Sequence, residues 1–373
     1  MSMKKMIYDR LTGRETSLAV IGLGYVGVPV ALRFARCFDV VGYDMDARRI
    51  EKLREKYGAG CGSIRFTSLE EELSRAAFYI VTVLTPVDER KNPDLTCLVE
   101  ATRTVARYLK RGDYVVYEST VYPGCTEEVC VPLLEKGSGL KLGADFKVGY
   151  SPERINPNDS EHTFSNTAKI VSANDGQALD EVARVYAEVV AADLCRASGI
   201  RVAEAAKMTE NVQRSVNIAL MNELQRLFSR MGIDMGEVID MASSKWNFVK
   251  YRPGLGGGHC IPVDPLYLVS AASKLGVEMP VTSSGCAVND GMAAYVVRSL
   301  LGAMGSDGRG ARALLMGVTY KENIDDIRNS RIAEMVGLLE REGMSVDVTD
   351  PHADPDKVYA MYGIRPVPAL RPP

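Results

Sequence analysis

A glycine pattern near the N-terminus constrains the fold of this chain more than any other feature. A short apolar run, residues 17–21, ends directly in Gly22-x-Gly24-x-x-Gly27, and a helical pattern follows through residue 38. A second apolar run, residues 39–44, ends in Asp44. The glycines permit a tight turn, close approach of the backbone to a pyrophosphate, and close packing of helix on strand. This order of elements predicts a dinucleotide-binding βαβ unit.

The acidic residue also bears on which dinucleotide binds. Asp44 suits hydrogen bonds to the ribose hydroxyls of NAD and would repel the extra phosphate of NADP. Arg48 and Arg49 follow closely, and a basic side chain there can hold such a phosphate, so NADP stays open as the alternative. We expect NAD.

The rest of the first half alternates strand-like and helical patterns. Further strands are expected at residues 78–83, 114–117, 146–150 and 168–171. This alternation predicts a parallel doubly wound sheet with helices on both faces. Polar loops at residues 81–86, 117–124 and 149–159 follow three of the strands. Each alone is typical of a proline-terminated turn. Because ligands gather at the carboxyl ends of such strands, the three together predict a shared site.

The middle of the chain is helical and contains a candidate polar pair. Residues 202–228 show helical periodicity without proline or glycine, and Lys207 and Asn211 are four apart on one face. An ammonium and an amide held side by side suit stabilisation of a developing oxyanion. A solvated pair is the alternative. A further helix is expected over residues 281–304, leading to the last domain.

The stretch PGLGGGHCIPVD, residues 253–264, contains a candidate nucleophile. Cys260 follows a glycine-rich loop and lies four residues before Asp264. A thiolate beside an acid–base group can carry out covalent chemistry, and the glycines let backbone amides approach a ligand. A buried structural cysteine is the alternative.

The last part begins another βαβ unit. A buried strand is expected over residues 311–320, a helix over 331–342 and a strand over 345–349. Lys321 and Arg328 lie in the loop after the first strand, where a phosphate could bind, and Asn329 or Ser330 could cap the helix. We expect three domains, with a glycine-rich hinge at residues 305–310: a Rossmann domain (1–198), a helical domain (199–304) and a partial C-terminal domain (305–373).

Composition excludes several functional classes. The chain has 373 residues, 25% of them charged, with a net charge of −3 and no basic block, so no nucleic-acid partner is expected. The apolar run at residues 18–32 is shorter than the ~20 residues that a membrane helix needs, and the N-terminus lacks a signal-peptide core. Eight cysteines without a CxxC pair and three scattered histidines favour reduced thiols and no metal. We expect a cytoplasmic protein.

Several motifs together resemble a known family. From about residue 17 to residue 369 the chain is similar to the UDP-glucose/UDP-mannuronate dehydrogenase superfamily, and especially to its UDP-N-acetylhexosamine 6-dehydrogenase branch. The motifs, in order, are GLGYVG, the Thr-Pro loop with NPDL, ESTVYPG, SPERINP, AEAAKMTEN, SKWNF, PGLGGGHCIPVDP, AVNDGM and TYKENIDDIRNS. The branch is suggested by SPERINP, SKWNF and GGHC-x-x-x-D.

The resemblance implies a fold and an activity. The fold is α/β: an N-terminal Rossmann domain, a central all-helical dimerisation domain and a C-terminal Rossmann-like UDP-binding domain, here shortened. The activity is NAD-dependent, four-electron oxidation of C6 of a UDP-N-acetylhexosamine, UDP-GlcNAc or UDP-GalNAc, for surface polysaccharides. The aldehyde is held by Cys260 as a thiohemiacetal, oxidised to a thioester and hydrolysed to the uronic acid. A homodimer through the central helices is implied.

The resemblance also implies residue roles. Lys207 and Asn211 hold the C6 oxygen, and the charge of Lys207 favours the Cys260 thiolate. Asp264 and Thr120 manage the proton or water, and Glu153 acts in thioester hydrolysis. His259 is not expected to be a base for Cys260, because adjacent side chains in an extended segment point apart. The implied NAD-binding residues are Gly22, Leu23, Gly24, Tyr25, Val26, Gly27, Asp44, Arg49, Thr85 and Thr120. The implied UDP-sugar residues are Glu153, Arg154, Asn156, Lys207, Asn211, Tyr251, Arg252, Gly254, Tyr320, Lys321 and Arg328.

The chain departs from the family pattern in two places. Leu84 replaces the usual proline of the Thr-Pro loop, and the C-terminal domain is some tens of residues shorter. The second departure motivates the hypothesis that the cofactor site is intact while UDP-sugar affinity is reduced. Two alternative functions stay open. One is a two-electron, NAD-dependent hydroxyacid dehydrogenase, which would not need Cys260, and the other is a non-catalytic NAD-binding remnant.

Overall fold

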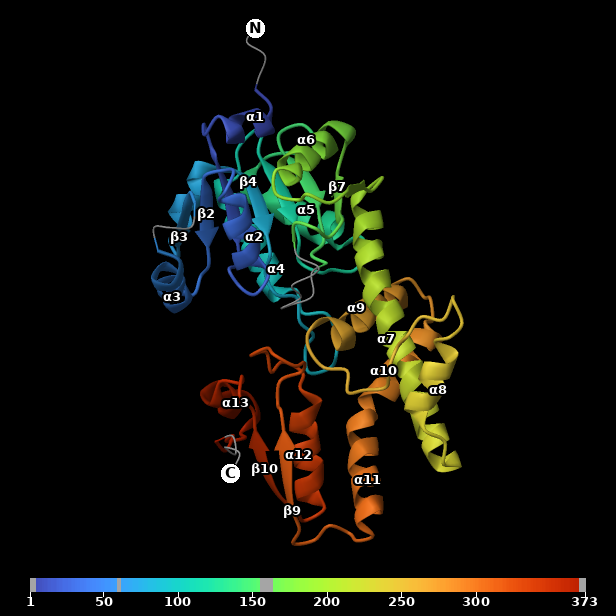
Figure 1. Cartoon of the computed structure of the whole chain (residues 1–373). Helices are drawn as coiled ribbons and strands as arrows, with labels where there is room; N and C mark the ends of the chain where they lie inside the picture. The colour runs from blue at the N-terminus through green and yellow to red at the C-terminus, as the bar shows by residue number, and fades with distance from the viewer. Residues whose placement is uncertain (1–4, 59–61, 155–163, 369–373) are drawn as a thin grey trace. The chain divides into compact units, whose positions relative to one another are not determined.

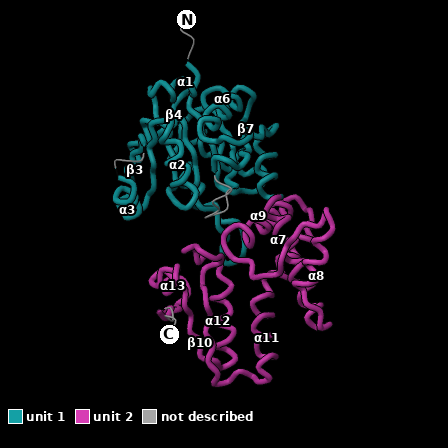
Figure 2. Tube along the Cα trace, in the orientation of Figure 1, with its two compact units in different colours: residues 1–209 teal, residues 210–373 magenta. Residues whose placement is uncertain are grey.

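A computed structural model describes residues 5–58, 62–154 and 164–368. The chain divides into two compact units, Met1–Thr209 and Glu210–Pro373 (Figure 2). The long helix α7, Ile200–Met231, belongs to both. The three-domain division expected from the sequence stays a prediction.

The first unit is built on an eight-stranded sheet with the order β3-β2-β1-β4-β5-β6-β7-β8 (Figure 1). Neighbouring strands are parallel except β6 and β7, which are antiparallel. The sheet is therefore the expected Rossmann-type sheet with one reversed strand pair. The strands are β1 Ser17–Ile21, β2 Val40–Tyr43, β3 Ile64–Thr67, β4 Ala76–Val81, β5 Tyr114–Tyr117, β6 Lys147–Tyr150, β7 Lys169–Ala173 and β8 Leu194–Arg196.

Helices cover both faces of this sheet. Phe34 of α2 contacts Tyr186 of α6 edge to face, with ring centroids 5.4 Å apart, so α2 and α6 share one face. Helices α4 and α5 pack against each other on the opposite face (Figure 1). The central strands are buried on both sides, which explains why they read as continuous apolar runs. The helices are α1 Ile7–Thr12, α2 Gly27–Phe34, α3 Ala47–Tyr57, α4 Thr96–Tyr108, α5 Val131–Ser138 and α6 Gly176–Ala187.

The second unit is mostly helical and carries a small parallel sheet. Strands β9, Arg312–Met316, and β10, Ser345–Thr349, pair with Leu314 opposite Asp347. Helices α11 and α12 pack on one face of this pair and form a core with Ala313, Leu315 and Val346. The helices are α8 Met235–Ala242, α9 Cys260–Lys274, α10 Pro280–Asp290, α11 Met292–Met304, α12 Arg331–Arg341 and α13 Pro355–Tyr362.

Three expectations about elements are corrected. The helix after the glycine pattern ends at Phe34 rather than residue 38. The helix expected over residues 281–304 is interrupted at Gly291, between α10 and α11. The strand expected to be buried over residues 311–320 ends at Met316, which is 81% exposed, and Leu314 is 40% exposed. Its burial was overpredicted because α11 and α12 cover only one face of the pair.

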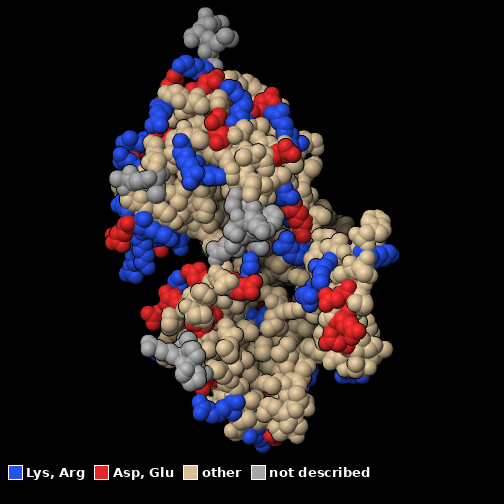
Figure 3. All heavy atoms as spheres, viewed as in Figure 1, with Lys and Arg blue, Asp and Glu red and all other residues tan. Residues whose placement is uncertain are grey.

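The surface mixes both signs of charge. Acidic and basic side chains are interspersed on the face of each unit that Figure 3 shows. In the described part of the chain, no helix has both the length and the apolar character required to traverse a lipid bilayer.

Candidate active site

The glycine turn after β1 has the geometry that its sequence predicts. Gly22 has φ +92°, a conformation that side chains disfavour, and its N–H donates to Tyr43 O at 2.9 Å. A Cβ on Gly27 would lie 1.9 Å from Gly22 O and 2.6 Å from Thr82 Oγ1, so the helix packs too closely for any other residue. A Cβ on Gly24 would meet no described heavy atom within 4 Å, which leaves room above the turn for a phosphate.

Asp44 is fixed beside this turn. Its Oδ2 accepts hydrogen bonds from Leu23 N (2.8 Å) and Arg49 Nη1 (3.0 Å), and its Oδ1 accepts one from Asp46 N (3.0 Å). The carboxylate is buried, whereas the Arg49 side chain is 47% exposed. Of the other residues expected at the cofactor, Leu23 is buried, Tyr25 is exposed and Val26 precedes α2. These contacts position a carboxylate where a ribose would lie in a Rossmann fold.

Two expected cofactor residues lie on adjacent loops. Thr85 follows β4 and is buried, and Thr120 follows β5 and is half-buried. The two loops are tied together because Ser119 Oγ donates to Val83 O at 2.7 Å. Since β4 and β5 are parallel neighbours, both threonines belong to the carboxyl edge of the sheet. This is the edge where a doubly wound sheet binds ligands.

Glu153, expected to act in hydrolysis, belongs to a buried ionic cluster. Lys169 Nζ donates to Glu118 Oε2 (3.0 Å) and to Glu153 Oε2 (3.1 Å). Arg154 Nη1 donates to Ala168 O at 2.8 Å, so the SPER segment is held against the start of β7. Asn156 lies outside the described residues. No pattern in the sequence indicated Glu118 or Lys169 as members of the site.

Helix α7 brings a further acid into the first unit. Glu204 is fully buried, and its carboxylate accepts hydrogen bonds from Gly124 N (2.6 Å) and Thr126 N (2.9 Å). Burial raises the pKa of Glu204 to about 7. Lys207, three residues further along α7, is buried as well. Glu204 thus anchors α7, the helix that carries Lys207, to the ESTVYPG loop. Glu204 could have been recognised from the sequence as an acid among the alanines of the AEAAK segment.

In the second unit, Asn211 and Asp264 lie side by side and are both buried. Asn211 Nδ2 donates a short hydrogen bond to Asp264 Oδ2. Cys260 is the first residue of α9 and lies one turn before Asp264, so the thiol and the carboxylate share a helix face. A helix N-terminus favours a thiolate. The cysteine is half-buried.

The local structure corrects one argument about His259. Residues 259 and 260 are not extended: His259 has helical backbone angles (φ −85°, ψ −45°) and precedes α9. The argument that His259 and Cys260 point apart, as neighbours in an extended segment do, is therefore wrong. It applied strand geometry to the start of a helix.

The glycines before Cys260 also serve the packing of another motif. A Cβ on Gly257 would lie 2.9 Å from Tyr320 Cβ, and one on Gly258 would lie 2.7 Å from the Tyr320 ring. Gly258 N donates to Arg328 O (3.1 Å), and Asn329 Nδ2 donates to Gly258 O (2.9 Å). The glycine-rich loop and the TYKENIDDIRNS motif therefore form one structure, although about sixty residues separate them.

Arg328 is held in place by a local acid. Its Nε donates to both oxygens of Asp326, at 2.9 and 3.0 Å, and this pairing raises the pKa of Arg328. Burial alone would raise the pKa of Asp326, but the hydrogen bonds from Arg328 outweigh it and the pKa is lowered. The Arg328 charge also interacts with Cys260. Lys321, in the same loop, is half-buried.

Other expected sugar-site residues surround the glycine-rich loop. Gly254 is clamped by Asn222, whose Oδ1 accepts from Gly254 N (2.8 Å) and whose Nδ2 donates to Gly254 O (3.1 Å). Tyr251 Oη contacts Gln213 Oε1 at 3.5 Å. Arg252 is exposed, with its Nη2 3.5 Å from Asp240 Oδ1.

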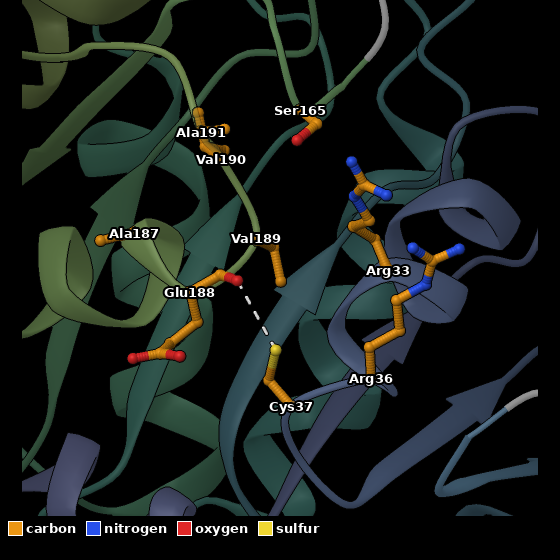
Figure 4. Close-up of a pocket in the computed structure, with 9 residues that line it drawn as sticks. All are labelled: Arg33, Arg36, Cys37, Ser165, Ala187, Glu188, Val189, Val190 and Ala191. Carbon is orange, nitrogen blue, oxygen red and sulfur yellow. Dashed lines mark hydrogen bonds between the residues drawn. The ribbon is translucent and has the colours of Figure 1, made fainter.

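A cavity of about 220 Å³ lies elsewhere in the first unit, between the end of α2 and the segment after α6 (Figure 4). Cys37 Sγ donates to Glu188 O at 3.5 Å across it. This cavity is distinct from the predicted site, since none of the described residues in its walls belongs to that site. They are Arg33, Arg36, Cys37, Ser165, Ala187, Glu188, Val189, Val190 and Ala191.

The sheet, the glycine turn and the buried acid define the first unit as the nucleotide-binding part of a dehydrogenase, and sequence comparison supplies the family. Residues 16–190 match the NAD binding domain of the UDP-glucose/GDP-mannose dehydrogenase family, residues 201–291 its central domain and residues 314–371 its UDP binding domain. The chain belongs to this family, as the sequence resemblance predicted, and is a NAD-dependent nucleotide-sugar dehydrogenase. This membership favours that activity over the hydroxyacid dehydrogenase alternative.

Individual relatives are similar over most of their length. UDP-N-acetyl-D-glucosamine 6-dehydrogenase of Pseudomonas aeruginosa is 46% identical, over 95% of this chain and 87% of that protein. The solved UDP-D-ManNAc dehydrogenase of Pyrococcus horikoshii has a TM-score of 0.84 at 32% identity, covering 90% of this chain and 84% of that one. The solved UDP-glucose dehydrogenase of Pyrobaculum islandicum has a TM-score of 0.85 at 30% identity, covering 96% of this chain and 86% of that one.

Proposed function

We propose that this protein oxidises the C6 hydroxyl of a UDP-N-acetylhexosamine, UDP-GlcNAc or UDP-GalNAc, to the uronic acid for surface polysaccharide synthesis. The observation that carries the proposal is the buried Asn211–Asp264 pair one helical turn from Cys260. A thiol at the start of α9, a carboxylate one turn further along and an α7 amide bonded to that carboxylate suit covalent oxidation of an aldehyde. Two relatives named UDP-N-acetyl-D-glucosamine 6-dehydrogenase, 46% and 45% identical, support this choice of sugar.

The proposed mechanism assigns a role to each residue. Lys207 and Asn211 hold the C6 oxygen and stabilise its developing negative charge. Asp264, with Thr120, takes the hydroxyl proton as the first hydride leaves C6. Cys260 adds to the resulting aldehyde, and loss of the second hydride leaves a thioester on its sulfur. NAD, when held at the turn from Gly22 to Gly27 and by Asp44, would supply the hydride acceptor for each oxidation.

Glu153 completes the proposed cycle by accepting a proton from the water that hydrolyses the thioester. Cofactor binding is assigned to the turn from Gly22 to Gly27 with Leu23, Tyr25 and Val26, and to Asp44, Arg49, Thr85 and Thr120. The nucleotide sugar is assigned to Arg154, Asn156, Tyr251, Arg252, Gly254, Tyr320, Lys321 and Arg328.

We also propose a cytoplasmic homodimer formed through the central helices. Exposed apolar side chains on α7 support the dimer: Leu220, Leu227 and Met231 are 48%, 52% and 59% exposed. Their spacing of seven and four residues places them along one side of the helix. Mutation of Leu227 and Met231 to glutamate, followed by measurement of molar mass in solution, tests this: the proposal expects a monomer.

NADH stoichiometry tests the activity. The purified protein is assayed with limiting UDP-GlcNAc, UDP-GalNAc, UDP-ManNAc and UDP-glucose. We expect two NADH per sugar and highest kcat/KM with an N-acetylhexosamine in the gluco or galacto series. One NADH per sugar, or none with any of the four, would overturn the proposal.

Replacement of Cys260 tests the covalent step, and replacement of a second cysteine is its matched control. Cys260→Ser is expected to lower kcat by at least about 10³-fold, because removal of a nucleophile eliminates the covalent route. Cys286→Ser replaces another half-buried thiol of the second unit, on α10, and should leave the rate unchanged. If Cys260→Ser keeps the wild-type rate, no thioester forms.

A further inference from the structure

The first unit contains three charged side chains that meet out of contact with solvent. Lys169 opens β7, Glu118 follows β5 and Glu153 follows β6. Their side chains are 4%, 0% and 13% exposed, and Lys169 Nζ donates to both carboxylates. Aromatic rings enclose the ammonium: Nζ lies 4.9 Å from the Phe164 centroid and 5.7 Å from that of Tyr186. The cluster is built from three strand ends and a helix.

Burying such charges is costly, so each needs a reason. Burial lowers the pKa of Lys169, but the two carboxylates outweigh this and the net shift is upward. Burial raises the pKa of Glu118. Glu118 alone neutralises the lysine, and its second oxygen, Oε1, already accepts a hydrogen bond from Tyr186 Oη. Charge balance within the core therefore does not require Glu153.

Glu153 is the member of the cluster that reaches solvent, and its orientation is fixed at both oxygens. Oε2 accepts from Lys169 Nζ (3.1 Å) and Oε1 accepts from Arg154 N (2.7 Å). The neighbouring Arg154 side chain is bound to Ala168 O, directly before Lys169. The plane of the carboxylate is consequently set by the start of β7.

We propose that Lys169 is a positioning residue that holds the Glu153 carboxylate in a single orientation for hydrolysis of the Cys260 thioester. This rests on the proposed function. In that step the water oxygen bonds to the acyl carbon and the carbon–sulfur bond breaks. One water proton passes to Glu153 and then to the Cys260 thiolate, which frees the uronic acid and restores the thiol. Lys169 itself transfers no proton.

Replacement of the lysine separates the two half-reactions. Lys169→Met is expected to lower kcat about 10- to 100-fold, the usual cost of losing a group that orients a catalytic one, with little change in KM for UDP-GlcNAc. Both hydride transfers precede hydrolysis. Rapid mixing should therefore show a burst of two NADH per active site, followed by slow turnover. Mass spectrometry of the acid-quenched enzyme should show the acyl group on Cys260.

A conservative variant distinguishes positioning from a merely structural role. Lys169→Arg keeps a cation at the site and should recover most of the rate.

Matched variants protect the test against loss of folding. The double variant Lys169→Met with Glu118→Gln removes the lysine without leaving its fully buried partner charged. Lys147→Met breaks a similar ion pair at the start of β6, where Nζ lies 2.7 Å from Asp175 Oδ2, and should show no burst. The double variant Lys169→Met with Glu153→Gln should lose no more of the wild-type kcat than Glu153→Gln alone, because the two residues act on one step.

The outcomes separate this inference from the proposed function. If wild type gives two NADH per sugar but the folded double variant at residues 169 and 118 shows no burst, Lys169 does not position Glu153. Additive losses in the Lys169→Met, Glu153→Gln double variant would overturn it too. If wild type makes no acyl-enzyme and Cys260→Ser is fully active, the proposed function fails instead.

Discussion

The two units each contain a strand that ends in a glycine and a second strand that ends in an acid. Gly22 after β1 has φ +92°, and Gly317 after β9 has φ +100°. In the first unit Leu23 N donates to Asp44 at 2.8 Å, and in the second unit Val318 N donates to Asp350 at 2.7 Å. The same turn therefore forms in two different sheets.

The sheets around these turns differ greatly. Strand β1 lies between β2 and β4 in an eight-stranded sheet, and Leu18 is fully buried. Among the described strands, β9 pairs with β10 alone, and its Leu314 and Met316 are 40% and 81% exposed. The turn depends on a glycine and an acid a short distance apart, whereas burial depends on how many elements cover the strand. Local chemistry and core formation are thus separable in this molecule.

The sharpest test of this comparison replaces a turn glycine in each unit. Gly22→Ala places a Cβ 2.7 Å from Val83 Cγ1 and 3.1 Å from Val83 N, a backbone atom that cannot move aside, at a φ of +92°. We expect loss of about 3 kcal/mol or more of stability, the upper range for overpacking, and no measurable NAD binding. Thermal unfolding and NAD titration measure the two effects.

The matched variant lies in the second unit. A Cβ on Gly317 would have no described heavy atom within 4 Å, so Gly317→Ala costs only the strain of a positive φ, about 1–2 kcal/mol. NAD affinity should stay at the wild-type value. Equal losses from both variants would mean that the two turns do not differ in packing.

A pair of leucines tests the strands themselves. Leu18→Ala removes a fully buried side chain from β1 and should cost about 2–5 kcal/mol. Leu314→Ala removes a side chain from the open face of β9 and should cost less than about 1 kcal/mol. Urea unfolding gives both values. A large loss at Leu314 would show that another molecule covers that face in solution.

The acids of the two units predict opposite dependences on pH. The pKa of Glu204, in the first unit, is raised to about 7 by burial, so its contribution to stability is full below 4.5 and is lost as pH rises to about 7. At about 1.4 kcal/mol per pH unit, the change amounts to about 3 kcal/mol. Comparison of thermal unfolding of wild type and Glu204→Gln from pH 4.5 to 7.5 isolates it; parallel curves would contradict it.

For Asp350, in the second unit, burial alone would raise the pKa, but four backbone N–H groups outweigh it and lower the pKa below the ordinary value of 3.8. Its contribution is therefore present above pH 3.8 and is lost as the pH falls further. The unfolding temperature of Asp350→Asn should therefore vary less with pH than that of wild type in the acidic range, and equally at higher pH.

Features with a local sequence signature were predicted well. The strands at residues 114–117 and 345–349 have the predicted bounds, since each is a short apolar run between turn residues. The Gly22–Gly27 turn followed from the glycine spacing together with the strand before it, the helix after it and Asp44. That Lys207 and Asn211 lie on one helix, four residues apart, also needed only a period of 3.6.

Features that depend on tertiary contacts escaped the sequence. Lys169 and Glu118 are 51 residues apart, and no pattern along the chain indicates that they meet. Tyr320 fills the space above Gly258, so part of the glycine richness before Cys260 serves packing, which ligand-based reasoning overlooked. The exposure of β9 was missed because an apolar run does not reveal how many helices cover it.

The smallest expected effect concerns the two acids that accept hydrogen bonds from the backbone N–H groups of the turns. Asp44 receives hydrogen bonds from Leu23 N, Asp46 N and Arg49, and in the proposed complex it also binds the ribose. Asp44→Asn keeps its shape but weakens acceptance at one oxygen, so NAD should bind about 10-fold more weakly, or about 1.4 kcal/mol. Asp350→Asn makes the same change at the other turn and should leave NAD affinity unaltered. Isothermal titration of both variants decides whether the acid serves the cofactor or only the turn. A drop in NAD affinity at Asp350 alone would show that the shared geometry does not identify the cofactor site.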